Sequence, residues 1–222
     1  DWSSDVCSSD LVDTAVGVPK SREEMFEFYS FIRRGTLDAE SREGRGGLEF
    51  PAGYMFKEPP KWEADDMTDP VDMLLAELDA VGITHAIINV DDEAAARAFR
   101  DHPGRFSAQI NVDPNEGMDA VRRIVRFHEE FGLKAVGAFP AGLTPQVPLN
   151  DKKWYPVYAK CVELGIAFCS TVGVPGPRLP FACQDVALVD EVCWFFPELT
   201  FVMRHGAEPW ADLAVKLMLK WP

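Results

Sequence analysis

The chain has 222 residues and a formal net charge of −14, with 36 acidic against 22 basic side chains. This acidity disfavours nucleic acids and anionic membranes as partners, because both carry negative charge. Hydrophobic residues make up 47% of the sequence, which is enough for one α/β domain with a sizeable core. No apolar run approaches the roughly 18 residues of a membrane span, and no basic flank with an apolar centre indicates a signal peptide.

The cysteines lie at positions 7, 161, 169, 183 and 193 and show no metal-binding spacing. Free, mostly buried thiols in a reducing compartment account for this pattern, so we expect a cytoplasmic protein.

The two ends of the chain look unlike the rest. Residues 1–10 match, codon by codon, the translation of a common sequencing-adapter oligonucleotide. We therefore interpret residues 1–11 as a non-native segment and expect the native N-terminus to be missing. Residues 220–222 follow a helix directly, where another strand is expected, so we expect the C-terminal end to be cut as well.

From residue 12 onward, short apolar strands alternate with longer helices. A strand over 12–18 precedes a helix that a capping box of Ser21 and Glu24 begins and that runs to residue 34. Residues 35–68 lack periodicity and are expected to form a long loop or insertion. The later pattern predicts strands over 84–90, 106–112, 133–139, 166–171 and 199–205, and helices over 71–81, 92–100 (capped by Asp91), 116–131, 152–164, 185–196 and 211–219.

Six strands, each followed by a helix, predict βαβ units and a parallel sheet. Strands that are apolar on both faces, such as residues 86–90, favour a sheet covered on both sides or a closed barrel. We therefore expect an α/β fold, a TIM (β/α)8 barrel with about six of its eight βα units. The alternative is an open doubly-wound sheet, although no glycine-rich phosphate-binding sequence follows the first strand.

The carboxyl ends of the strands are where a barrel of this kind places its active site. His205 ends the sixth strand and is our first candidate for a general acid–base, and the alternative is a hydrogen bond to a neighbouring loop. Other candidates at this edge and in its loops are Asp13, residues 89–92, Asn111, Asp113, Phe139, Ser170, Thr171, Arg178, Glu208 and Trp210.

Several of these candidates have simpler alternative roles. Asp13 can act as a turn cap, Ser170 as a donor to a backbone carbonyl, and Glu208 as an acidic residue in the first turn of the last helix. Cys169 alternates with Ser170, so we expect Cys169 to face the helices and Ser170 to face the barrel mouth. His128 lies on the apolar face of its helix and is expected to be a core residue.

Three stretches of this sequence resemble the amidohydrolase-related family: residues 154–171, residues 174–177, and residues 196–206, which read Phe-Pro-Glu-Leu-Thr-Phe-Val-Met-Arg-His-Gly. The resemblance covers roughly residues 69–222. It implies a distorted TIM barrel, usually with one divalent metal, that hydrolyses or non-oxidatively decarboxylates carboxylated rings or their derivatives.

The same resemblance implies that the metal site is degraded. The family's first strand ends in an aspartate followed by a His-x-His pair, but here Asp13 is followed by Ala15 and Gly17 at the histidine positions. Ser170 stands at a further histidine position, and His205 is the retained ligand. One imidazole cannot hold a catalytic zinc ion, so we expect no metal or other cofactor unless segments outside this sequence supply ligands.

We therefore expect an amidohydrolase-related hydrolase or decarboxylase for a small carboxylated ring or lactone. His205 is the expected general acid–base, oriented by Asp13 or by a carboxylate outside this sequence, and Ser170 is expected to bind a substrate oxygen. Arg178 or Arg204 is expected to bind a substrate carboxylate, and the substrate site is completed by Phe139, Glu208 and Trp210. The alternative is a catalytically inactive barrel that serves as a binding or scaffold subunit. Homo-oligomer formation stays open, and the free edges of an unclosed barrel favour association.

Overall fold

The computed structural model describes residues 11–35, 39 and 69–222, so most of the expected loop over 35–68 and the segment 1–10 lie outside the described residues. Six strands form one parallel sheet, and their spatial order follows their order in the chain. This order rules out a doubly-wound sheet, in which the strand order reverses. The strands are β1 (Leu11–Val16), β2 (Ile83–Asn89), β3 (Phe106–Asn111), β4 (Ala135–Ala138), β5 (Ala167–Thr171) and β6 (Phe201–Arg204).

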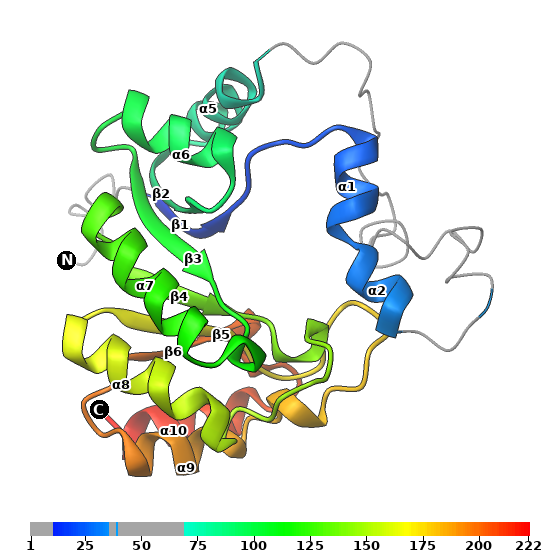
Figure 1. The fold of residues 1–222 in the computed structure, drawn as a ribbon, viewed down its shortest axis with the longest axis vertical. Helices are drawn as coiled ribbons and strands as arrows, with labels where there is room; N and C mark the ends of the chain where they lie inside the picture. The colour runs from blue at the N-terminus through cyan, green and yellow to red at the C-terminus, as the bar shows by residue number, and fades with distance from the viewer. Residues whose placement is uncertain (1–10, 36–38, 40–68) are drawn as a thin grey trace, which may run out of the picture.

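The helices follow the strands in the predicted alternation, and those from α5 onward surround the outer side of the sheet (Figure 1). The α-helices are α1 (Arg22–Phe28), α2 (Ser30–Gly35), α5 (Pro70–Ala80), α6 (Glu93–Asp101), α7 (Met118–Phe131), α8 (Tyr155–Leu164), α9 (Leu188–Phe195) and α10 (Ala211–Lys220). Short 3-10 turns are η2 (Pro114–Glu116), η3 (Pro140–Gly142), η4 (Lys152–Trp154), η5 (Ala182–Gln184) and η6 (His205–Ala207).

The predicted capping box begins α1. The Ser21 hydroxyl accepts from the Glu24 amide at 3.2 Å, and the Glu24 carboxylate accepts from the Ser21 amide at 2.8 Å. The single helix expected to residue 34 is instead two helices that meet at Tyr29. Two smaller predictions are wrong: Asp92, not Asp91, caps α6, and His128 is only half-buried on α7.

The buried core lies between the sheet and its surrounding helices. Phe168 of β5 is fully buried and packs against the rings of Trp154 and Tyr158, with centroids 5.4 and 4.8 Å away. The Tyr158 hydroxyl donates to the Leu149 carbonyl at 2.6 Å, which satisfies its buried polar atom. Other fully buried side chains of this layer are Ala86, Ile88, Ile110, Ile124 and Val136.

The inner face of the sheet shows that the sheet curls as a barrel does. In a flat sheet, β3 and β6 would lie about 14 Å apart and their side chains would stand perpendicular to it. However, Nη2 of Arg204 on β6 donates to Oε1 of Gln109 on β3 at 2.5 Å, across β4 and β5. The protein therefore forms a curled, incomplete TIM barrel of six strands, as predicted.

Two predictions about environment can be compared with this fold. The four described cysteines, at positions 161, 169, 183 and 193, are free and buried, as expected. Among the described helices, none combines the length and the apolar character that crossing a membrane requires.

Candidate active site

A cavity of about 730 Å³ opens at the carboxyl ends of β5 and β6. His205 and Glu208 line it from the turn after β6, and Thr171 lines it from the end of β5. A TIM barrel carries its active site at this edge, and apolar walls with few polar groups are typical of small-molecule sites. The remaining lining residues are Phe28, Tyr29, Phe31, Phe139, Val172, Val174, Pro175, Gly176, Pro177 and Pro209.

The backbone that presents His205 is strained. His205, Gly206 and Ala207 all have left-handed conformations, with φ of 61°, 63° and 56°. For residues other than glycine this conformation costs on the order of 1–3 kcal/mol, and such residues concentrate at functional sites. The strain turns the chain sharply after β6, so that the His205 side chain reaches the cavity instead of continuing the strand.

A close contact between two loops holds this turn. The Val174 amide donates to the Glu208 carbonyl at 2.8 Å, and the Gly173 amide donates to the Gln184 carbonyl at 2.8 Å. Gly173 has a φ of 96°, and a Cβ at this position would lie 2.3 Å from the Glu208 carbonyl oxygen. Only glycine therefore fits where the loop after β5 passes the loop after β6.

Aromatic side chains of α1 and α2 cover one side of the cavity. The Phe31 ring meets the Phe139 ring edge-on with centroids 5.7 Å apart, and the Phe28 and Tyr29 rings meet edge-on at 5.0 Å. Burial raises the pKa of the Tyr29 hydroxyl, which therefore stays protonated at neutral pH. Phe139 lines the cavity as expected. The contribution of α1 and α2 was not predicted, although their clustered aromatic residues are a signal in the sequence.

The structure does not bring Asp13 to His205. Oδ1 of Asp13 accepts from the Ala15 amide at 2.9 Å, which is the alternative role of turn cap. Asp13 lines a separate shallow hollow with Val81 and other residues, on the edge strand opposite to β6. Among the described residues, the expected orientation of His205 by Asp13 therefore has no geometric support.

The expected orientation of β5 is wrong. Ser170 is fully buried, shares the helix-facing side of the strand with Phe168, and donates its hydroxyl to the Thr171 carbonyl at 3.1 Å. Cys169 instead faces the inner side, where it contacts Arg204, and burial raises its pKa more than Arg204 lowers it. Ser170 therefore cannot bind a substrate oxygen in the cavity.

Other expected substrate residues are spread over four environments. Glu208 lines the cavity and precedes α10, so it is not in the first turn of that helix. Trp210 packs against Phe181 with ring centroids 5.4 Å apart, and Arg178 is exposed on the loop after β5, so neither lines the cavity. Arg204 extends across the inner face of the sheet to Gln109.

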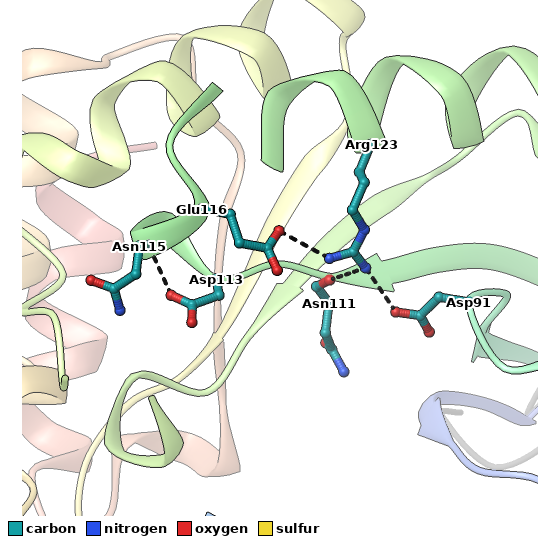
Figure 2. A network of polar contacts seen from close by, with 6 residues as sticks. All are labelled: Asp91, Asn111, Asp113, Asn115, Glu116 and Arg123. Atoms are coloured by element: carbon teal, nitrogen blue, oxygen red, sulfur yellow. Dashed lines mark hydrogen bonds and ion pairs between the residues drawn. The ribbon is translucent and has the colours of Figure 1, made fainter. Parts of the chain in front are cut away.

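Two carboxylates near the ends of β2 and β3, Asp91 and Glu116, pair with Arg123 (Figure 2). The Arg123 guanidinium pairs with Glu116 at 3.2 Å and Asp91 at 3.3 Å, and donates to the Asn111 carbonyl at 3.2 Å. Partial burial raises the pKa of Asp91, and the charge of Arg123 opposes this shift. Asp113 caps η2. These carboxylates serve local structure, so the candidate chemistry lies at the β5–β6 end of the site.

The positions that the sequence resemblance assigns to metal ligands do not fit a metal. Ala15 and Gly17 offer no donor atom in their side chains, and Ser170 points to the helix-facing layer. His205 is the one imidazole among these positions. In the part of the chain that the structure describes, no group of three or more His, Cys, Asp or Glu residues could hold a metal ion.

Comparisons with known proteins agree with this geometry. A family model described as an amidohydrolase matches residues 32–222, and no curated protein sequence matches the chain. A solved TIM-barrel protein of Bordetella bronchiseptica, described as uncharacterized, is 19% identical with a TM-score of 0.67, over 96% of this chain and 72% of that one.

Two further solved structures are enzymes. A 4-oxalomesaconate hydratase of Rhodopseudomonas palustris is 18% identical with a TM-score of 0.56, over 96% of this chain and 69% of that one. A 5-carboxyvanillate decarboxylase of Novosphingobium aromaticivorans, complexed with manganese and a nitrobenzoic acid, is 17% identical with a TM-score of 0.60, over 95% of this chain and 69% of that one. At these identities the likeness establishes the fold alone.

Proposed function

This chain belongs to the amidohydrolase family, and we propose that it is a hydrolase or a non-oxidative decarboxylase for a small carboxylated ring or a lactone. Family membership supports the general class of reaction. The names of two similar structures, a decarboxylase and a hydratase, support action on small carboxylated molecules. The aromatic walls of the cavity support a ring as substrate, because aromatic side chains stack on flat molecules.

One observation carries the proposal: His205 is held by a strained turn at the wall of the cavity, at the carboxyl end of β6. An imidazole is the side chain best suited to exchange protons near neutral pH. Glu208 and Thr171 line the same cavity and supply a carboxylate and a hydroxyl to it. The residues at the family's ligand positions do not fit a metal, so the proposed reaction uses only side chains of this chain.

In lactone hydrolysis, His205 accepts a proton from a water molecule as the water oxygen attacks the acyl carbon. The ester C–O bond then breaks, and His205 returns the proton to the departing alkoxide, so that the imidazole ends in its starting state. In decarboxylation, the protonated imidazole donates to the ring carbon as the bond to the carboxylate breaks and carbon dioxide leaves. Both routes need a single acid–base group beside the ring.

The test is turnover by the His205→Ala variant. We expect the wild-type protein to convert members of a panel of carboxylated lactones and hydroxybenzoates, assayed by acid release and carbon dioxide release. Loss of general acid–base catalysis should lower kcat by about 10²–10⁴-fold in the variant. His102→Ala is the matched control, because His102 follows α6 and does not line the cavity.

Full turnover by the His205→Ala variant would contradict the assignment of His205. If the folded wild-type protein converts no member of the panel, the alternative of a catalytically inactive binding subunit is favoured instead. Circular dichroism melting of both variants separates loss of catalysis from loss of folding.

A further inference from the structure

The inner face of the sheet carries a guanidinium that is held by an amide. Nη2 of Arg204 donates to Oε1 of Gln109 at 2.5 Å, and Gln109 is only 3% exposed. Among the described residues, no carboxylate lies within ion-pair distance of Arg204, and its Nε atom is buried without a hydrogen-bond partner. Arg204 therefore has no neutralising carboxylate among the described residues and presents a buried donor without a partner inside the curled sheet.

Glutamine at position 109 orients the Arg204 guanidinium without neutralising its charge. An amide oxygen orients a guanidinium by accepting a hydrogen bond, whereas a carboxylate would orient it equally well and also neutralise it. A charged group that is half-buried without a counter-ion is costly unless a ligand supplies the opposite charge. The pair thus has the chemistry of an anion site and not that of a structural salt bridge.

The described strand residues around Arg204 are uncharged. Asn89 pairs with Gln109 in the strand register, and Asn111 follows two residues later, so these amides share the inner face with Arg204. A Cβ at Gly137 would lie 2.1 Å from Oδ1 of Asn111 and 3.4 Å from Nη1 of Arg204, so glycine gives both side chains room against β4. Of all residues in the six described strands, Asp13 alone is acidic, and its register partner Ala86 belongs to the helix-facing layer.

We propose that Arg204 is the anion subsite that receives the carboxylate of the ligand, with Gln109 as the positioning residue that aims its guanidinium. The subsite itself does not depend on the proposed function, but the identification of its ligand as the substrate rests on that function. Arg204 pairs with Thr171 in the strand register and directly precedes His205, and both of these neighbours line the cavity. A ring in the cavity therefore extends its carboxylate down into the sheet, toward Arg204, while His205 faces the ring.

The decisive variant is Gln109→Glu, which keeps the shape of the side chain and places a carboxylate against Arg204. The probe is benzoate, with benzamide as its neutral counterpart, and binding is measured by isothermal titration calorimetry. We expect the wild-type protein to bind benzoate more tightly than benzamide, and the variant to bind benzoate at least about tenfold more weakly with unchanged benzamide affinity. Thr200→Glu is the matched control, since it adds the same charge at an exposed position.

Two results would overturn the proposal: equal benzoate affinity in the folded Gln109→Glu and Thr200→Glu variants, or no preference for benzoate over benzamide in the wild-type protein. If the Gln109→Glu variant does not melt cooperatively, the affinities of the Arg204→Gln variant for benzoate and benzamide are compared instead. Because binding is measured without turnover, the anion subsite at Arg204 and the proposed catalytic function can each fail without the other. Weakened benzoate binding in a protein with no turnover supports the subsite and counts against the proposed function. Turnover with an unchanged KM in Gln109→Glu overturns the subsite alone.

Discussion

Gly173 allows the loops after β5 and β6 to touch at the wall of the cavity, and this contact predicts a specific effect of substitution. Gly173→Ala should destabilise the protein more than Gly165→Ala, because a Cβ at 173 meets backbone atoms of the loop after β6, whereas a Cβ at 165 meets nothing within 4 Å. Both glycines have positive φ, so both variants share a conformational cost of about 1–2 kcal/mol. Urea unfolding measures the difference, and equal losses of stability would show that the loop contact is unimportant.

Side-chain orientation within strands was only partly visible in the sequence. The polar alternation of Ser107, Gln109 and Asn111 is a period-two signal that could have identified the polar inner face of β3. On β5, Cys169 and Ser170 are both small and both buried, so hydrophobicity could not decide which of them faces inward. The strand register with β4 and β6 decides it, and register depends on contacts distant in the chain.

The junction of α5 and α6 is held by one carboxylate that serves both helices. Oδ1 of Asp69 accepts from the Val71 amide at 2.9 Å and caps α5, and the Arg97 guanidinium of α6 donates to both carboxylate oxygens at 2.5 and 2.6 Å. The hydrogen bonds from Arg97, followed by that from the Val71 amide, lower the pKa of Asp69 from its ordinary 3.8 to about 2. The ionised carboxylate is therefore favoured in the folded protein.

This lowered pKa predicts how stability depends on pH. The contribution of Asp69 is present above pH 3.8, its ordinary pKa, and is lost as the pH falls to about 2, where the folded carboxylate also becomes protonated. Asp69→Asn should therefore lower the melting temperature at neutral pH, and the difference from wild type should shrink as the pH falls through about 2 and vanish below it. Asp119→Asn is the control, because Asp119 pairs with Arg122 within one exposed helical face. A difference that persists at the lowest pH would contradict this role.

At the scale of elements, the alternation of strands and helices was predictable because hydrophobic periodicity is a local property of the sequence. The residues at which helices and strands end were less predictable. The helix predicted from Ser21 to residue 34 breaks at Tyr29, where the aromatic side chains of α1 and α2 turn toward the cavity and Phe139. The last strand ends at Arg204 because His205 adopts a left-handed conformation, which no propensity of histidine predicts.

At the scale of the whole molecule, the consecutive strand order and the curl of the sheet create the candidate site. Adjacent strands bring Thr171 and His205 together at one edge, and curling brings Arg204 of β6 to Gln109 of β3. The sequence predicted the barrel class from the number of βα units and from the resemblance of its last third. The contact across the inner face was not predictable, because it joins residues that are 95 positions apart in the chain.

The outer surface predicts how the protein associates. Trp194 of α9 and Met218 and Leu219 of α10 are 68%, 64% and 74% exposed, and these helices adjoin through the Trp194 and Trp221 rings, 6.4 Å apart. In the described part of the chain, no further strand pairs with the outer edge of β6. Large apolar side chains beside a free strand edge favour association, so we expect concentration-dependent self-association in sedimentation velocity experiments.

The double variant Met218→Glu with Leu219→Lys tests this, because it removes two exposed apolar side chains of α10 without changing the net charge. We expect the variant to sediment as a smaller species than the wild-type protein at the same concentration, with an unchanged melting temperature, because neither side chain is buried. The matched control is Val81→Glu with Met118→Lys, which removes two side chains that are 59% and 53% exposed, directly after α5 and at the start of α7. If both double variants associate as strongly as the wild-type protein, the surface of α9 and α10 does not drive association. The edges of β1 and β6 that no strand of the described residues covers then become the better explanation.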